Sequence, residues 1–246
     1  MNADILKQRR TIRKYKTTDV PQSLLNRLLQ TAAQASTTGN MQLYSVIVTR
    51  DEAKKRALAP AHFNQPMITA APVVLTFCAD FNRFVKWCEF RNAKSGYDNF
   101  QSFLAAALDA VIFTQQFCTA AEMEGLGICY IGTTTYNPDM IIKALNLPKL
   151  VMPVTTITVG YPDEMPQQPD RLPAEAYIHE ESYNDYDKQV IDSIYSPKEA
   201  LPENIGFVKE NNKETLAQVF TDIRYTKQNN EVFSVKFIET LKAQGF

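Results

Sequence analysis

One long apolar segment constrains the fold of this chain more than any other feature of its sequence. Residues 100–124 carry hydrophobic side chains on all faces of a helix, and the alanines at 105, 106, 107 and 110 allow close approach by a neighbouring element. The most apolar part, 103–121, is interrupted by Asp109, Gln115 and Gln116, which favours a buried core helix over a membrane span. The segment therefore predicts a central helix, with a partner chain as one candidate for covering it.

The composition is typical of a soluble globular protein. The 246 residues include 26 Lys+Arg and 27 Asp+Glu, a net charge of −1 that provides no global field for DNA, RNA or an anionic membrane. The four cysteines form no CxxC pair and only two histidines accompany them, so no metal is expected. The start of the chain lacks the apolar run of a secretory signal. We expect a cytoplasmic protein with a single domain over residues 1–246.

Periodicity predicts strands separated by helices. Helical spacing covers 20–36 and 138–145, and strand patterns cover 44–50, 72–80, 128–132 and 153–160. This order indicates an α/β or α+β fold. Residues 163–192 carry nine acidic side chains and three prolines, with a fourth proline just before them at 162, which predicts an extended polar excursion. Helical spacing returns over 214–244, as expected of an arm that embraces another subunit.

The basic segment 7–16, KQRRTIRKYK, is the sharpest local anomaly in a chain of net charge −1. Arginines at 9, 10 and 13 around Thr11 offer planar donors and a hydroxyl that suit a phosphate. A solvated basic helix face is the alternative, and a nucleic-acid contact is disfavoured because no second basic cluster exists. Two further segments, 125–135 with its glycines and 36–42 with its hydroxyls and amides, could approach a flat ligand or simply form turns.

Taken together and in order, these segments resemble the FMN-dependent nitroreductase family, most closely its NADPH-linked oxygen-insensitive nitroreductase and flavin-reductase group. The resemblance runs from Arg9 to Phe246 and rests on RRTIRKY, ASTTGNMQ before YSVIV, FNQPMITAAPVVLTFCADFNR, EGLGICYIG, VGYP followed by RLP, HEESY, and the final LKAQGF. It implies an α+β homodimer: a mixed sheet flanked by helices, a long central helix at the interface, and a C-terminal extension wrapped on the partner, with FMN bound between the subunits.

The resemblance also assigns FMN-binding roles to particular residues. The phosphate group would be held by Arg9, Arg10, Thr11 and Arg171. Arg13 would place a positive charge near flavin N1 and O2. The ring and ribityl chain would meet a loop of the other subunit that contains Thr37, Thr38, Asn40 and Gln42. The pyrimidine edge and N5 would meet Asn64, Tyr130, Gly132 and Thr133. No catalytic side chain is implied.

Two departures from the family pattern bear on the ligands. Pro169 stands where a lysine is common, two residues before Arg171, so phosphate binding should depend more on the arginines. No arginine lies between Arg171 and Arg224 to grip the 2′-phosphate of NADPH, and the lysines available there are Lys188, Lys198, Lys209 and Lys213. The choice between NADH and NADPH therefore stays open.

The implied activity is ping-pong transfer of hydride from NAD(P)H to FMN N5 and then of two electrons to a small electron-poor aromatic: a nitroaromatic, a quinone or free flavin. Another flavin reaction on the same fold, such as reductive dehalogenation or flavin fragmentation, is the nearest alternative. A flavin-binding protein without turnover and a plain phosphate- or nucleic-acid-binding module are the others. No membrane or nucleic-acid partner is expected.

Overall fold

The computed structural model describes residues 4–246, which form two compact units. One unit comprises the chain up to Gln167 together with Phe233–Phe246, and the other comprises Gln168–Val232. The single domain expected over residues 1–246 stays a prediction.

The first unit is built around a four-stranded sheet with the strand order β1-β2-β4-β3. The strands are β1 (Tyr44–Thr49), β2 (Val73–Asp80), β3 (Gly127–Ile131) and β4 (Val151–Gly160). In the register, Tyr44 faces Ala79, Asp80 faces Val151, and Ile131 faces Thr156. The start of β1, the end of β2, the start of β4 and the end of β3 therefore lie at the same end of the sheet.

The α+β class is confirmed, but the sheet differs in one respect from the mixed sheet implied by the resemblance. Every strand pair among the described residues is antiparallel. The reason is topological, because the helical connections from β1 to β2 and from β3 to β4 each return the chain in the opposite direction beside the strand that it left.

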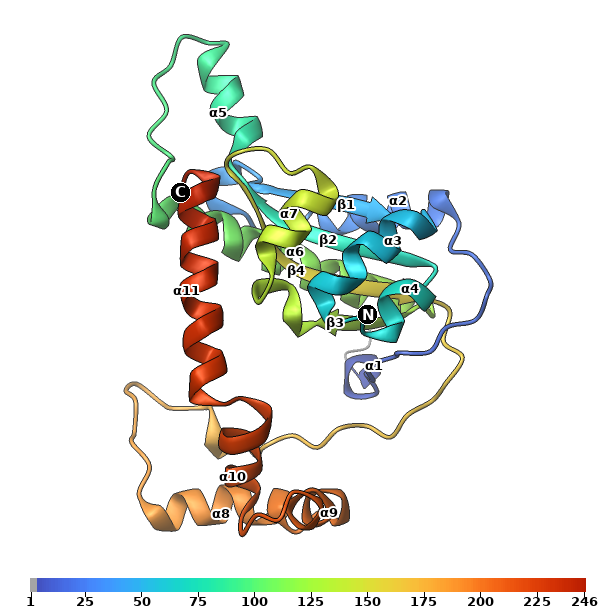
Figure 1. Cartoon of the computed structure of the whole chain (residues 1–246), viewed down its shortest axis with the longest axis vertical. Coiled ribbons are helices and arrows are strands. Elements are labelled where there is room, and N and C mark those ends of the chain that lie inside the picture. The colour runs from blue at the N-terminus through green and yellow to red at the C-terminus, as the bar shows by residue number, and fades with distance from the viewer. Residues whose placement is uncertain (1–3) are drawn as a thin grey trace. The chain divides into compact units, whose positions relative to one another are not determined.

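Helices cover both faces of this sheet (Figure 1). One face carries α2 (Gln22–Ala32) and α6 (Phe100–Met123), and the other carries α3 (Glu52–Leu58), α4 (Pro66–Ala70) and α7 (Pro138–Leu145). Short 3₁₀ turns η1 (Thr38–Asn40), η2 (Ala59–His62) and η3 (Gly132–Thr135) connect them. β2 is fully buried because Leu75 and Phe77 join the core beneath α6 while Val74 joins the core beneath α3 and α4.

The predicted central helix is confirmed as α6. The side chain of Asn99 caps its start by accepting a hydrogen bond from the Ser102 N–H. By length and composition alone α6 could cross a membrane, but Phe113 and Phe117 pack on the sheet in the main core. The opposite face of α6 is apolar and exposed, through Leu104, Leu108, Val111 and Ile112.

The remaining helices of the first unit are α1 (Asp4–Lys7) and α5 (Asn82–Glu89). The second unit contains η4 (Ala174–Ala176), α8 (Lys188–Glu199), α9 (Pro202–Glu210), α10 (Leu216–Val219) and a π-helical turn, Phe220–Arg224. α11 (Lys227–Gln244) begins in the second unit and ends in the first.

The predicted polar excursion over 163–192 needs a correction at its end. The segment is largely irregular up to Asp187, whose side chain caps α8 by accepting from the Val190 N–H, and the last residues are helical. Ile194, Leu216 and Val219 are buried within the second unit and give it an apolar centre. The helical return predicted over 214–244 is observed as α10, the π-helical turn and α11.

Candidate functional site

Two glycines allow the basic segment to pack directly on the edge of the sheet. The Ile12 N–H donates to the Ile128 carbonyl at 3.0 Å, so the segment runs beside β3. A Cβ added to Gly127 would lie 2.7 Å from Ile12, and one added to Gly160 would lie 2.8 Å from Tyr15. These distances are shorter than van der Waals contact, so both positions require glycine for close approach.

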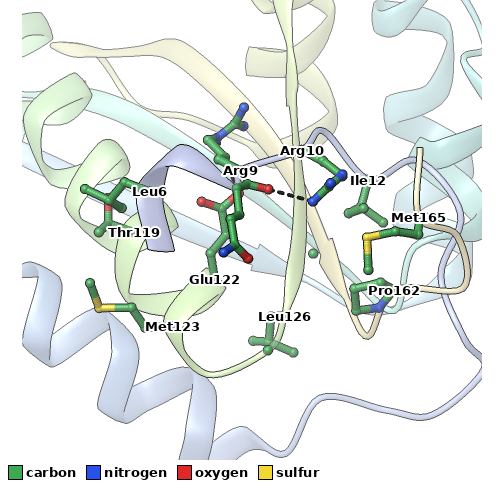
Figure 2. A pocket seen from close by; sticks show the side chains of 13 residues that line it. Leu6, Arg9, Arg10, Ile12, Thr119, Glu122, Met123, Leu126, Pro162 and Met165 are labelled. Atoms are coloured by element: carbon green, nitrogen blue, oxygen red, sulfur yellow. Dashed lines mark hydrogen bonds and ion pairs between the residues drawn. The ribbon is translucent and has the colours of Figure 1, made fainter. Parts of the chain in front are cut away.

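Arg9 and Arg10 lie at a cavity of about 240 Å³ between the basic segment and the end of α6 (Figure 2). Arg9 Nε lies 3.3 Å from Glu122 Oε1, and Arg10 Nη1 donates to the Gln8 carbonyl at 2.9 Å. Arg10 Nε is buried and has no hydrogen-bond partner among the described residues. A buried donor without a partner is costly, and an anion in the cavity would satisfy it.

Among the residues whose side chains the structure describes, Glu122 is the one carboxylate that lines this cavity. Burial raises the pKa of Glu122, and the Arg9 guanidinium opposes that rise only in part. The pair therefore holds Arg9 beside the cavity at an electrostatic cost, and an incoming anion would compete with Glu122 for Arg9.

Arg13 occupies a different position, beside β3. Its backbone N–H donates to Glu164 Oε1 at 2.6 Å, which ties the basic segment to the chain that follows β4. Its guanidinium is exposed and lies close to Cys129; burial raises the pKa of that thiol and Arg13 lowers it. Thr11 is half-buried and lies in the sequence between Arg10 and Arg13.

The end of β3 forms the second part of the site. Gly132 is exposed, and a Cβ built on it would meet nothing within 4 Å, so the backbone is open to close approach here. The hydroxyl of Thr133 accepts from Gln65 Nε2 at 3.2 Å and lies 3.1 Å from His62 Nδ1. The loop that contains Asn64 therefore lies against this strand end, with the Asn64 side chain exposed.

His62 and Tyr130 support this strand end from within the protein. His62 is fully buried, and burial lowers its pKa to about 4, so the ring is neutral at pH 7. The Tyr130 hydroxyl donates to Gln115 Oε1 at 3.2 Å, and burial raises its pKa. Neither ring carries charge at neutral pH.

The loop that carries the predicted hydroxyl and amide side chains lies at a different edge of the sheet. Thr38 donates to Asp109 of α6 from both its N–H and its hydroxyl, at 2.8 and 2.9 Å. The loop leads into β1, whereas Gly132 follows β3, and these strands form opposite edges of the sheet, separated by three strand spacings or about 14 Å. One chain therefore divides the predicted residues between two sheet edges, with Thr37, Thr38, Asn40 and Gln42 at the β1 edge.

Arg171 belongs to the second unit, where its guanidinium is exposed and donates to the Asp170 carbonyl at 2.8 Å. His179 in the same unit accepts from the Asn184 N–H at 3.3 Å and lies 3.1 Å from the Tyr186 hydroxyl. These contacts within one turn agree with a structural role for His179.

In the first unit, the predicted residues along β3 and the segments that contact it are Arg9, Arg10, Thr11, Arg13, Asn64, Tyr130, Gly132 and Thr133. Sequence reasoning missed Gln65 and Asp109. Gln65 directly follows Asn64, which was predicted to contact the flavin, and Asp109 was visible as the one acidic residue in the apolar segment 103–121.

The cysteines contribute no reactive group. All four are buried and unpaired, and burial raises the pKa of Cys118 to about 12, which keeps it a thiol. The same cause raises the pKa of Cys78 still further. In residues 4–246 no cluster of His, Cys, Asp and Glu is arranged to hold a metal ion.

Comparison with known proteins identifies the family. The model described as "Nitroreductase family" matches residues 6–161, more than half of the chain. The chain belongs to the nitroreductase family. Within this family it is 34% identical over 212 residues to an FMN reductase (NAD(P)H) of Bacillus subtilis strain 168, covering 85% of this chain and 84% of the relative.

Two other nitroreductase-family comparisons span most of the chain. An oxygen-insensitive NADPH nitroreductase of Salmonella typhimurium strain LT2 is 31% identical over 188 residues, covering 76% of this chain and 77% of the relative. A crystal structure from Bacteroides fragilis NCTC 9343, described as an oxidoreductase, superposes with a TM-score of 0.97 at 62% identity over 98% of both chains.

Proposed function

We propose that this protein is an FMN-dependent NAD(P)H oxidoreductase of the nitroreductase and flavin-reductase type. Two observations carry the proposal: the cationic cavity at Arg9 and Arg10 by the start of β3, and the open backbone of Gly132 after the end of the same strand. The unpartnered Arg10 Nε fits a phosphate oxygen, and the open backbone at Gly132 fits the approach of a flat ring. The residues present therefore fit FMN.

Different residues would hold different parts of the cofactor. Arg9, Arg10 and Thr11 of the first unit would bind the phosphate, and the part that the resemblance gives to Arg171 of the second unit stays a prediction. Asn64 or its neighbour Gln65 would meet the ring edge beside Thr133. Arg13 would supply a fixed positive charge near the ring, which favours electron uptake. When bound, FMN supplies the two-electron chemistry that links NAD(P)H to a nitroaromatic, quinone or flavin acceptor.

A homodimer is the second part of the proposal. Leu104, Leu108, Val111 and Ile112 form an exposed apolar face on α6, with Leu108 56% exposed. Such a face fits a subunit interface, and an isologous contact would pack it against its own copy. A second copy could also bring its β1-edge loop to the β3 edge of the first, which one chain alone cannot do.

The lysines of the second unit bear on the choice between NADH and NADPH. Three of the four lysines that could replace the missing arginines form ion pairs in the second unit: Lys188 with Asp192, Lys198 with Asp170 and Lys213 with Asp222. Their charges are already partly neutralised. We therefore expect NADH to be used as well as NADPH.

A comparison of FMN with riboflavin tests the phosphate site. Arg10→Gln should weaken FMN binding about tenfold, because a hydrogen bond from a charged group to phosphate is lost, and should leave riboflavin binding unchanged. Arg56→Gln is the matched control, since Arg56 is exposed on α3 and pairs with Glu52 of the same helix. Equal loss for both flavins, or no loss for FMN, would contradict the assignment of Arg10.

A further inference from the structure

Asp109 is the main link between α6 and the hydroxyl and amide loop, residues 37–43. Its side chain is only 2% exposed. Oδ1 accepts from the Thr38 N–H at 2.8 Å and from the Thr38 hydroxyl at 2.9 Å, and Oδ2 accepts from the Leu43 N–H at 3.3 Å. One carboxylate thus fastens both ends of the loop to the helix.

The loop needs such fastening because its backbone is unfavourable. Gly39, Asn40 and Gln42 have φ values of 54°, 55° and 55°, in the left-handed region that non-glycine residues rarely adopt. Strained backbone persists where surrounding contacts determine its shape. The Arg83 guanidinium adds a second anchor by donating to the Gln42 carbonyl.

We infer that Asp109 is a positioning residue for the flavin site, an inference that rests on the proposed function. It holds the loop in the shape that presents Thr37, Asn40 and Gln42 to the cofactor. Thr38 acts with Asp109, because its hydroxyl proton is already donated to the carboxylate and is not available to a ligand. Thr38 is therefore an anchor of the loop, and the direct contacts belong to its neighbours.

The position of Asp109 on α6 gives the inference a second consequence. Leu108, Val111 and Ile112, on the exposed face of the same helix, belong to the proposed subunit interface. The loop is therefore fixed to the helix that would set the distance between the two subunits. The position of α6 would therefore determine where the side chains of this loop meet the flavin bound to the partner subunit.

Three single variants, and the double variant that combines the first two, test this inference in the full-length protein. Asp109→Asn keeps the shape but replaces one acceptor oxygen with an NH₂ donor, which opposes an N–H of the loop. Thr38→Val removes one of the bonds without changing α6. Thr114→Val is the control, because Thr114 is buried on α6 and its hydroxyl bonds only to the Ala110 carbonyl of its own helix.

Two measurements are made on each variant: FMN binding, read as affinity and as the visible circular dichroism of the bound flavin, and amide hydrogen exchange of Thr38 and Leu43 without FMN. Asp109→Asn should weaken FMN binding about tenfold, Thr38→Val about threefold, and the double variant no more than Asp109→Asn alone. Exchange at both amides should quicken in Asp109→Asn and stay unchanged in Thr114→Val. The visible circular dichroism of bound flavin should change only in the two loop variants.

The outcomes separate this inference from the proposed function. Wild-type FMN affinity in both loop variants, or fully multiplicative effects in the double variant, would overturn the role of Asp109 while leaving the proposed function intact. If the wild type binds no FMN, the proposed function fails and the cofactor role of Asp109 fails with it, whatever the exchange rates show. If Asp109→Asn does not fold, Thr38→Val decides by the same two measurements.

Discussion

Acidification should destabilise this protein through His62 by an amount that the structure allows to be calculated. Burial lowers the pKa of His62 from 6.5 to about 4. The unfolded chain therefore takes up a proton more readily than the folded chain as the pH falls below 6.5. A pKa difference lowers the unfolding free energy by about 1.36 kcal/mol per unit once the pH is below both pKa values. At about pH 4.5 the histidine of the folded chain is still mostly unprotonated, so the loss of unfolding free energy is about 2.5 kcal/mol.

The assay is urea denaturation at about pH 7.5 and about pH 4.5, for the wild type and for His62→Asn, interpreted by linear extrapolation. Asparagine cannot take up a proton, and its amide can replace Nδ1 as a partner of the Thr133 hydroxyl. Carboxylates elsewhere titrate in both proteins, so the difference between the two pH dependences isolates His62.

The wild type should lose about 2.5 kcal/mol more than His62→Asn between the two pH values. Equal losses would refute the reasoning, because a histidine that titrates normally in the folded state contributes no such difference. The cause would then be water or flexibility around His62 that lets its ring ionise in place.

Three further predictions concern the glycines and the α6 face. Gly127→Ala should lower the unfolding free energy by about 1–3 kcal/mol through overlap with Ile12, and it should also weaken FMN binding. Gly206→Ala is the control and should do neither, because a Cβ at Gly206 meets nothing within 4 Å. Urea denaturation and FMN titration measure both effects, and equal behaviour of the two variants would contradict the prediction. Gly132→Ala should keep wild-type stability but lose FMN affinity, and unchanged affinity would remove Gly132 from the site. Leu108→Glu should convert a dimer into a monomer by light scattering, and a dimer that survives would place the interface elsewhere.

The sequence predicts the core of this fold better than its periphery. The continuous apolar run of β2 and the long apolar segment of α6 are visible because both elements bury most of their surface. The short α3 and α5 have mixed polar faces and were missed. A signal for α3 existed, since Asp51 caps it by accepting from the Lys54 N–H, a preference that can be recognised in the sequence.

The site residues show a similar limit. The role of Asn64 stays a prediction, whereas the contact of its neighbour Gln65 with Thr133 was not visible in the sequence, because it follows two residues, Phe63 and Asn64, with left-handed backbone. Asp109 could be recognised as unusual in an apolar helix, but its partner Thr38 lies 71 residues away. Contacts at that separation depend on the packing of the whole unit and leave no local pattern.

The most direct test of the account is an absorbance spectrum of the purified protein, followed by addition of NADH or NADPH under argon. We expect flavin bands that bleach with either donor and return when a quinone or nitroaromatic is added. Protein that is colourless and takes up no added FMN, or bound flavin that stays oxidised with both donors, would contradict the proposed oxidoreductase function.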